Sequence, residues 1–236
     1  MAVEDLGHEA AELLSLTGVG EARSLNKLAE LAVRQVPGCS GAHATVWRDR
    51  ELISMAATHP DTADLTDLQL KVGCGPLITA VSEGVSVSCP DTLRETRWPE
   101  WCEEALRKGV RCSAHLVRTL PPMTLVLSLF GVRPAVLDTD AAPVAQTLTA
   151  FGGAMLANTM VYGEAQRTAT QLKDSVAARA ITDQAKGVLM HALGCDADAA
   201  LKHLRRESQR RHVKVTQVAA EVIAAYGGRD SGTLPP

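Results

Sequence analysis

The stretch VAQTLTAFGGAMLANTMVYGEAQRTATQLKDSV, residues 144–176, has the strongest periodicity in the chain and decides the fold prediction. Its apolar positions alternate in steps of four and three, which is the heptad pattern of a helix that pairs with another helix. The ten positions are Val144, Leu148, Phe151, Met155, Asn158, Tyr162, Ala165, Ala169, Leu172 and Val176. The pattern predicts one long helix that joins two halves of the chain.

This helix is predicted to form a coiled coil over residues 144–176 in a homodimer. Between residues 155 and 176 it has little core of its own chain to cover, so the apolar stripe needs a partner helix. The small residues and the single Asn of the stripe are compatible with a two-stranded coiled coil. The residues expected at the dimer interface are Phe151, Met155, Tyr162, Ala169, Leu172 and Val176. The alternative is that the first part of the stripe packs on its own domain.

The sequence differs in character on the two sides of this helix. Before residue 140, short β-like runs alternate with Gly and Pro, whereas no proline occurs between Pro143 and Tyr226. Residues 1–163 carry 13 Lys and Arg against 19 Asp and Glu, and residues 164–236 carry 11 against 8, so the net charges are −6 and +3. The 236-residue chain is therefore predicted to contain an α+β domain followed by an all-α domain. An anionic partner is expected to bind the basic C-terminal part.

Local patterns divide the N-terminal half into helices and five strands. Apolar periodicity predicts helices at 6–16 and 25–36, and two further helices are expected after Gly75-Pro76 and at 99–108, where proline fits the first turn. The strands are expected at 43–47, 52–57, 85–89, 113–120 and 125–132. The charged turn 48–51 is expected to join the first two strands as a hairpin. Five strands with inserted helices make an α+β sandwich.

Three helices account for the C-terminal part. After Val176 the apolar stripe shifts to a new face of the helix, and Gly194 is expected to end that helix. Asp196 is the expected N-cap of the second helix, and Thr216 is the expected cap of the third. These helices are predicted to form a small bundle, followed by a flexible tail at 227–236.

Residues in all three of these helices resemble the ANTAR domain in type and spacing. They are Arg179, Ala185-Lys186-Gly187-Val188-Leu189-Met190, Ala200, Leu204-Arg205, Ser208, Lys214 and Val218-Ala219. The resemblance spans residues 170–226. It implies a dimeric RNA-binding module that acts on paired small stem-loops in nascent transcripts and prevents formation of a terminator hairpin.

Basic residues of this region form the candidate RNA-binding site. Between residues 202 and 214, six basic side chains stand against one acid, Glu207. At ~100° per residue several of these cations share one outer helix face, where they can line phosphates. Gly187 lacks a side chain, so another backbone can approach it closely, either the second helix of the bundle or the nucleic acid. The residues expected to bind RNA are Arg179, Lys186, Gly187, Lys202, Arg205, Arg206, Arg210 and Lys214.

The N-terminal half, residues 5–162, resembles the GAF domain of actinobacterial sensors. The residues that carry the resemblance are Val72-Gly73-Cys74-Gly75-Pro76, Val85-Ser86-Val87, Asp91-Thr92, Arg97-Trp98-Pro99 and Gly109-Val110-Arg111-Cys112. It implies a central antiparallel sheet with a pocket for a small molecule on one face, and the fold does not name that ligand. The whole chain is thus similar to actinobacterial antitermination regulators with a GAF sensor and an ANTAR output domain.

Two other functions stay open at this point. A DNA-binding regulator would use the same basic helix but would need side chains that read bases in a groove. Some GAF proteins reduce free methionine sulfoxide with cysteines, and Cys74 lies in a Gly-Cys-Gly-Pro turn that favours an exposed thiol. The six cysteines form no CxxC pair, and the chain has no P-loop, nucleophile elbow or paired metal motif. We therefore expect a regulator without enzyme activity, catalytic residues, metal or cofactor.

The remaining expectations concern the location of the protein and residues with an ordinary structural role. No apolar run reaches the ~18–20 residues of a membrane span, and the acidic N-terminus lacks a signal peptide pattern. A cytoplasmic protein with reduced cysteines and no membrane partner is expected. His43 and His115 are expected to be hydrogen-bonded core residues, and Trp98 and Trp101 to pack in a core or lid.

Overall fold

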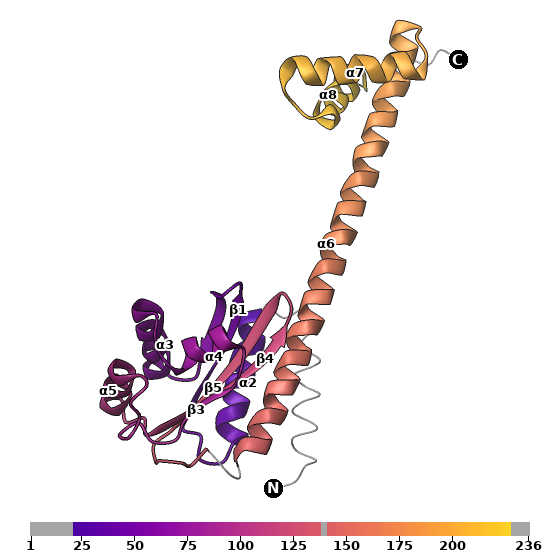
Figure 1. The fold of residues 1–236 in the computed structure, drawn as a ribbon. Coiled ribbons are helices and arrows are strands. Elements are labelled where there is room, and N and C mark those ends of the chain that lie inside the picture. The colour runs from indigo at the N-terminus through magenta and orange to yellow at the C-terminus, as the bar shows by residue number, and fades with distance from the viewer. Residues whose placement is uncertain (1–20, 138–140, 228–236) are drawn as a thin grey trace. The chain divides into compact units, whose positions relative to one another are not determined.

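The computed structural model describes residues 21–137 and 141–227, and the chain divides into two compact units, Met1–Gly163 and Glu164–Pro236 (Figure 1). The helix expected at 6–16 lies outside the described residues, as do residues 228–236 of the tail expected at 227–236. Gly227 is the last residue of a helix and not part of a tail. One helix, α6 (Ala141–Leu193), contributes residues to both units.

The first unit is built on one five-stranded antiparallel sheet with the strand order β2-β1-β5-β4-β3 (Figure 1). The strands are β1 (Gly41–Arg48), β2 (Glu51–Ala57), β3 (Val87–Cys89), β4 (Cys112–Leu120) and β5 (Met123–Gly131). All five predicted strands are confirmed, although β3 is shorter than expected. The β1–β2 hairpin turns at Asp49 and Arg50, whose φ angles of 51° and 66° are those of a type I′ turn.

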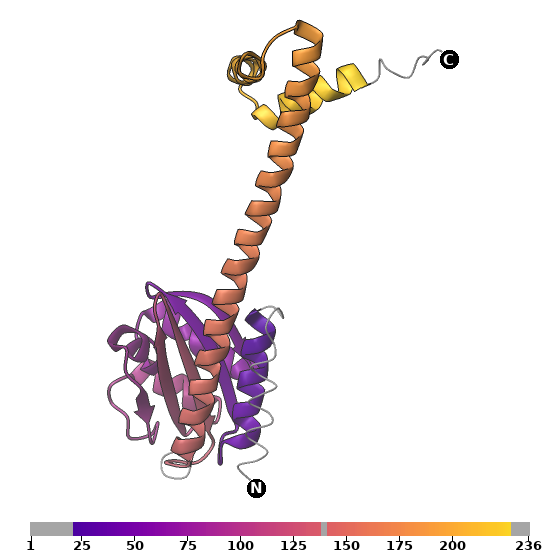
Figure 2. The ribbon, with the colours of Figure 1, turned by 90° about the vertical axis from the view of Figure 1, so that its right-hand side faces the viewer.

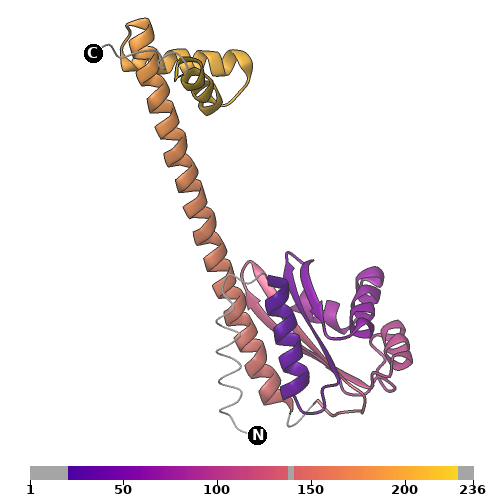
Figure 3. The same cartoon turned by 180° about the vertical axis from the view of Figure 1, so that it is seen from behind.

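Helices cover both faces of this sheet (Figure 2). One face carries α2 (Glu21–Gln35) and the first part of α6, which lie side by side (Figure 3). The other face carries α3 (Pro60–Val72), α4 (Pro76–Glu83) and α5 (Pro99–Arg107). Strand β1 lies between β2 and β5, and because side chains alternate along a strand, its nearly continuous burial shows that it is covered on both faces. The α+β sandwich predicted from the sequence is therefore confirmed.

Helix α3 is the element that the sequence pattern did not predict. Its buried face consists of Thr62, Leu65, Thr66 and Gln69. Only one of these four residues is strongly apolar, so the hydrophobic periodicity that reveals a helix is missing. Capping defines the helix instead: the His59 side chain accepts a hydrogen bond from the Asp61 backbone N–H, and Gly73, with φ of 68°, ends it.

Helix α6 runs without interruption from Ala141 to Leu193, which confirms the predicted long helix. Its first part packs closely on the sheet and on α2. A Cβ at Gly152 would lie 2.5 Å from Leu28 Cδ2 and 2.9 Å from Leu125 Cδ2. Glycine therefore allows the close approach of α6 to the core.

The apolar stripe of residues 144–176 has two different environments. Met155 is 3% exposed and belongs to the core of the first unit, so the expectation of Met155 at a dimer interface is not met. Phe151 is half-buried. The alternative of packing on its own domain thus holds for the first part of the stripe. Four of the residues expected at the interface are exposed, namely Tyr162, Ala169, Leu172 and Val176.

The second unit is a three-helix bundle made of the end of α6, α7 (Ala197–Arg211) and α8 (Val215–Gly227). Its core consists of Ala185, Leu189, Ala200, Leu204, Val218 and Ala219. Gly194, with φ of 61°, follows the last residue of α6, and the Asp196 carboxylate accepts a hydrogen bond from the Ala199 N–H at 2.7 Å. These observations confirm the predicted bundle, helix end and N-cap.

The start of α8 differs from the prediction. The helix begins at Val215, and the Lys214 carbonyl accepts hydrogen bonds from the N–H groups of Gln217 and Val218. Lys214 therefore occupies the cap position, and Thr216 lies inside the first turn. The prediction of Thr216 as the cap is wrong, because a hydroxyl residue near a helix start does not by itself fix the position of the first turn.

Candidate nucleic-acid interface

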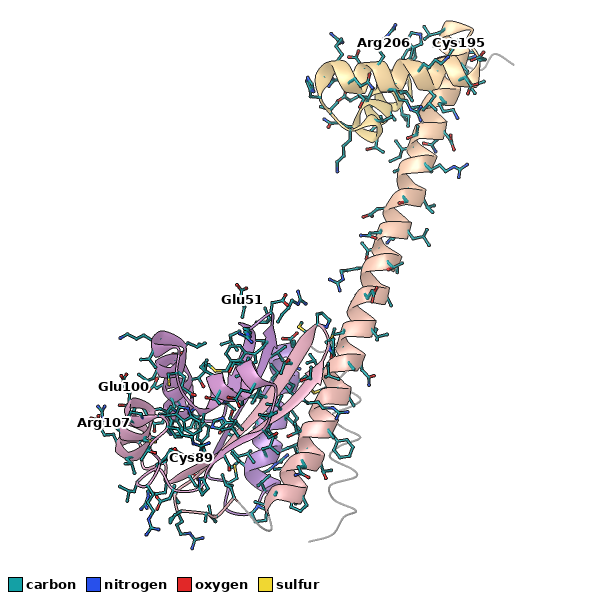
Figure 4. The ribbon with its side chains drawn as sticks, viewed as in Figure 1. Glu51, Cys89, Glu100, Arg107, Cys195 and Arg206 are labelled. Atoms are coloured by element: carbon teal, nitrogen blue, oxygen red, sulfur yellow. The ribbon has the colours of Figure 1, made fainter. Side chains whose placement is uncertain are left out.

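The outward face of α7 carries three exposed cations, Lys202, Arg205 and Arg206. They lie opposite the buried face that includes Leu204, as a rotation of ~100° per residue requires. Figure 4 shows Arg206 on the side of α7 that faces away from α8. Among the described residues, Lys202 and Arg205 have no acidic partner, and the Arg206 guanidinium lies 3.2 Å from His203 Nδ1. This face therefore presents unneutralised positive charge to solvent.

Two further arginines at the end of α7 are ion-paired. The Arg210 Nε donates to Glu207 Oε2 at 2.9 Å, and this contact lowers the pKa of Glu207 and raises that of Arg210. Arg211 donates through both terminal nitrogens to the Glu221 carboxylate on α8. The sequence did not reveal this second pair, because the two residues are ten positions apart on different helices.

The remaining predicted RNA-binding residues lie on α6 and at the start of α8. Arg179 is exposed, and its Nε lies 3.8 Å from Asp183 Oδ2. The Lys186 ammonium lies 3.1 Å from Asp183 Oδ1 and is one-quarter exposed. Lys214 is exposed in the cap position of α8. The structure thus groups Lys202, Arg205 and Arg206 on one face and places Arg179 and Lys186 on another helix.

Gly187 on α6 faces open space. A Cβ added there would meet no heavy atom within 4 Å, so neither of the other helices requires a glycine at this position. Glycine inside a helix costs about 1 kcal/mol relative to alanine. Of the two explanations drawn from the sequence, close approach of the second helix is excluded. The other explanation, close approach of the nucleic acid, stays a prediction.

Residues 170–223 match the family model of the ANTAR domain. These residues form an ANTAR domain. It contains all eight residues that the sequence suggested for RNA binding, and its three-helix core is the bundle described above. No curated protein matches the chain.

Several solved structures share weak similarity with the chain. SdiA from Escherichia coli is 16% identical with a TM-score of 0.49, over 94% of this chain and 97% of that chain. The free methionine-R-sulfoxide reductase from Neisseria meningitidis is 13% identical with a TM-score of 0.48, over 68% and 95%. The GAF domain of the Acinetobacter phosphoenolpyruvate-protein phosphotransferase is 11% identical with a TM-score of 0.45, over 70% and 99%. These similarities are too low to assign an activity.

The cysteines of the first unit range from exposed to buried. Cys74 is exposed, as expected from its turn. Cys89 and Cys102 pack in one core cluster, a proximity that their sequence separation did not suggest. Burial raises the pKa of Cys89 to about 12 and also raises that of Cys102. These two thiols are therefore protonated at neutral pH and poor nucleophiles.

His43 and His115 are fully buried and confirm the expectation of core histidines. The His115 ring lies 2.8 Å from Ser128 Oγ through Nδ1 and 3.1 Å from Ser113 Oγ through Nε2. Burial lowers the pKa of His43 to about 4 and that of His115 well below its usual value. Within the described ranges, no group of three or more His, Cys, Asp or Glu side chains is placed to hold a metal ion.

No helix in the described part of the chain combines the length and apolar character required to cross a membrane.

Proposed function

We propose that this chain is a homodimeric RNA-binding regulator of transcription antitermination, of the actinobacterial type that the sequence resembles. Its ANTAR domain binds paired stem-loops in nascent transcripts in the cytoplasm, under the control of a GAF-like sensor domain. The single observation that carries the proposal is the ANTAR match at 170–223. The unpaired cations on the outer face of α7 are the groups proposed to bind the phosphates of the RNA.

Phosphate binding is favoured by cations that have no ion-pair partner. A side chain that is already ion-paired gains less from a phosphate, since it must first lose its partner. Lys202 and Arg205 have no such partner among the described residues, and Arg206 contacts only a histidine in that part of the chain. Cations arranged along one helix face neutralise successive phosphates and release their counterions, which is the main source of affinity for nucleic acid.

Dimerisation is supported by the exposed part of the stripe on α6. Tyr162, Leu172 and Val176 are 48%, 66% and 62% exposed, and exposed apolar side chains at heptad spacing favour pairing with a second helix. The bundle core uses a different face of α6, which includes Ala185 and Leu189. One helix can therefore serve the dimer and the bundle at the same time.

The experiment that tests the proposal compares three nucleic acids at one salt concentration. A dual stem-loop RNA is obtained by crosslinking the full-length protein to cellular transcripts. Fluorescence anisotropy measures the affinity of the protein for this RNA. The same measurement is made with the RNA that lacks its second stem-loop and with a DNA duplex of equal length. We expect the dual stem-loop to bind at least about tenfold more tightly, or ~1.4 kcal/mol. Equal or tighter binding of the DNA duplex would favour a DNA-binding regulator instead.

A further inference from the structure

Gly187 lies at the centre of an exposed group of residues on α6. Residues three and four positions apart are neighbours on a helix surface, so Asp183 and Gln184 lie one turn before Gly187, and Met190 lies one turn after it. All three neighbours are exposed. A Cβ at Gly187 would meet no heavy atom within 4 Å, so the helix backbone is open at this point. We call these four residues the Gly187 face.

Neither the bundle nor the proposed coiled coil is expected to cover the Gly187 face. The bundle core uses Ala185 and Leu189, which at ~100° per residue lie on the opposite side of α6. Heptad spacing leads from Val176 to Arg179 and Asp183, and the burial of charged groups between paired helices is unfavourable. The paired seam is therefore expected to end near Val176 and to leave this face open.

The Asp183 carboxylate is held between two cations that are themselves expected to bind RNA. The Lys186 Nζ donates to Asp183 Oδ1 at 3.1 Å, and the Arg179 Nε lies 3.8 Å from Asp183 Oδ2. The Asp183 side chain is nevertheless 54% exposed. Each carboxylate oxygen accepts about two hydrogen bonds, so both oxygens keep an acceptor position for another molecule. Since a carboxylate repels phosphate, the parts of an RNA that it can bind are base N–H groups and ribose hydroxyls.

Guanine has the base edge that is complementary to Asp183 and Gln184 together. Its Watson–Crick edge carries the acceptor O6 followed by two donors, the N1–H and the N2 amino group. A carboxylate can accept from both donors, and the Gln184 amide nitrogen can donate to O6. Adenine and cytosine have an acceptor nitrogen at the centre of this edge, which a carboxylate repels, and uracil has only one donor there. In a stem these groups of guanine are paired with cytosine, so the complementary base is an unpaired guanine in a loop.

We propose that an unpaired guanine of an RNA loop binds at Gly187, with its Watson–Crick edge toward Asp183 and Gln184 and its ring against Met190. The missing side chain lets the flat base approach the helix backbone, and the thioether of Met190 provides an apolar contact. This inference rests on the proposed RNA-binding function and adds the base that the protein selects. Asp183 and Gln184 determine specificity, whereas the cations on α7 bind phosphates of any sequence.

A selection experiment identifies the preferred base without knowledge of the target transcript. The probe is a library of RNAs with two fixed stems, each closed by a loop of random nucleotides, and it is selected on the full-length protein at one salt concentration. Guanine should be enriched at one loop position, and its replacement by adenine should weaken binding at least about tenfold. Binding without preference for any loop base would overturn this inference alone. The absence of binding to every RNA would contradict the proposed function as well.

The variant Asp183→Asn separates base recognition from simple electrostatics, because the two predict opposite effects. Loss of one negative charge should by itself strengthen the binding of any RNA. If the carboxylate accepts from guanine, the variant should instead bind the guanine-containing RNA at least about fivefold more weakly, since the Asn amide nitrogen meets a donor of the base. The adenine-containing RNA should bind the variant as tightly as the parent protein or more tightly. Tighter binding of both RNAs by Asp183→Asn would contradict the proposal.

Asp174→Asn is the matched control, because Asp174 is an exposed acid of the same helix outside the Gly187 face. It should change the affinities for the guanine and adenine RNAs by the same factor. Inosine in place of the guanine removes only the N2 amino group, so it should weaken binding to the parent protein several-fold and binding to Asp183→Asn much less. Equal effects of inosine on both proteins would show that Asp183 does not contact the base.

The other molecule that could cover this face is a second copy of the chain. Light scattering of the parent protein and of Asp183→Asn should therefore give the same mass, and circular dichroism should give the same helix content. A change in mass caused by Asp183→Asn would assign the Gly187 face to the contact between chains and would overturn its assignment to guanine.

Discussion

Arg211 at the end of α7 forms a two-point ion pair with Glu221 on α8, whereas Arg205, on the same helix, has no acidic partner among the described residues. The pair raises the pKa of Arg211 and lowers that of Glu221. The two arginines thus have different roles in the structure. Arg211 links two helices of the bundle, and Arg205 is available to an outside anion.

Substituting each of these arginines separates the two roles. Arg211→Gln should lower the thermal midpoint of unfolding slightly and leave RNA affinity almost unchanged, because its cation is already used within the bundle. Arg205→Gln should leave the midpoint unchanged and weaken RNA binding severalfold. Circular dichroism melting and anisotropy measure the two effects. If Arg211→Gln weakens RNA binding as much as Arg205→Gln, the proposed division is incorrect.

Two glycines of α6 offer a second matched pair. An added Cβ meets nothing within 4 Å at either Gly187 or Gly163. Alanine at each position should therefore raise the free energy of unfolding by about 0.5–1 kcal/mol, measured by urea denaturation. Gly187→Ala should nevertheless weaken RNA binding, because the methyl group blocks close approach, while Gly163→Ala should not. Unchanged RNA affinity in Gly187→Ala would remove Gly187 from the interface.

The sequence predicted the elements whose residues have strong periodicity. The long helix α6, the five strands and the three-helix bundle all follow from apolar spacing and from Gly, Pro and Asp at element ends. Helix α3 could not be predicted in this way, since its buried face is formed largely by Thr62, Thr66 and Gln69. The burial of Met155 was also missed, because the same heptad spacing serves a domain core and a coiled coil.

The sequence was sufficient to predict which basic residues form the candidate site, but not which of them form ion pairs. Spacing on α7 predicted a shared outer face for Lys202, Arg205 or Arg206, and Arg210. In the structure Arg210 is ion-paired with Glu207. The pairing of Arg211 with Glu221 depends on how two helices pack, which local sequence does not specify. The same holds for Trp101 Nε1, which has no hydrogen-bond partner among the residues that the structure describes.

Buried histidines make the first unit sensitive to acid. The pKa of His43 is about 4 in the folded protein, against ~6.5 in an unfolded chain. Above pH ~6.5 the His43 ring is neutral in both states and does not change the free energy of unfolding with pH. As pH falls from ~6.5 to about 4, only the unfolded chain gains the proton, so the free energy of unfolding falls by ~1.4 kcal/mol per pH unit. His115 acts in the same direction.

Tryptophan fluorescence measures this acid sensitivity selectively, because Trp47, Trp98 and Trp101 all lie in the first unit. Urea unfolding at pH 7 and pH 5 should show a large loss of stability at the lower pH. His43→Gln should reduce the loss relative to the parent protein. Equal stability at both pH values would show that these histidines are not buried as neutral rings.

The exposed stripe on α6 predicts the oligomeric state. Leu172→Glu combined with Val176→Glu should convert a dimer to a monomer, because four glutamates would meet in the paired seam. Light scattering at micromolar concentration measures the change. Thr170→Glu combined with Ala177→Glu, two exposed positions outside the stripe, should leave the dimer intact. A monomeric parent protein, or equal disruption by both double variants, would contradict a seam through Leu172 and Val176.

The salt dependence of RNA binding tests the central claim most directly. Lys202, Arg205 and Lys214 are exposed and have no acidic partner among the described residues, so all three are proposed to contact phosphates. Each lost contact should change the slope of log affinity against log salt by about 0.7–0.9. Replacing all three with Gln should therefore flatten the slope by roughly two to three units, with helix content unchanged. An unchanged slope and unchanged affinity would show that RNA does not bind this face of the ANTAR domain.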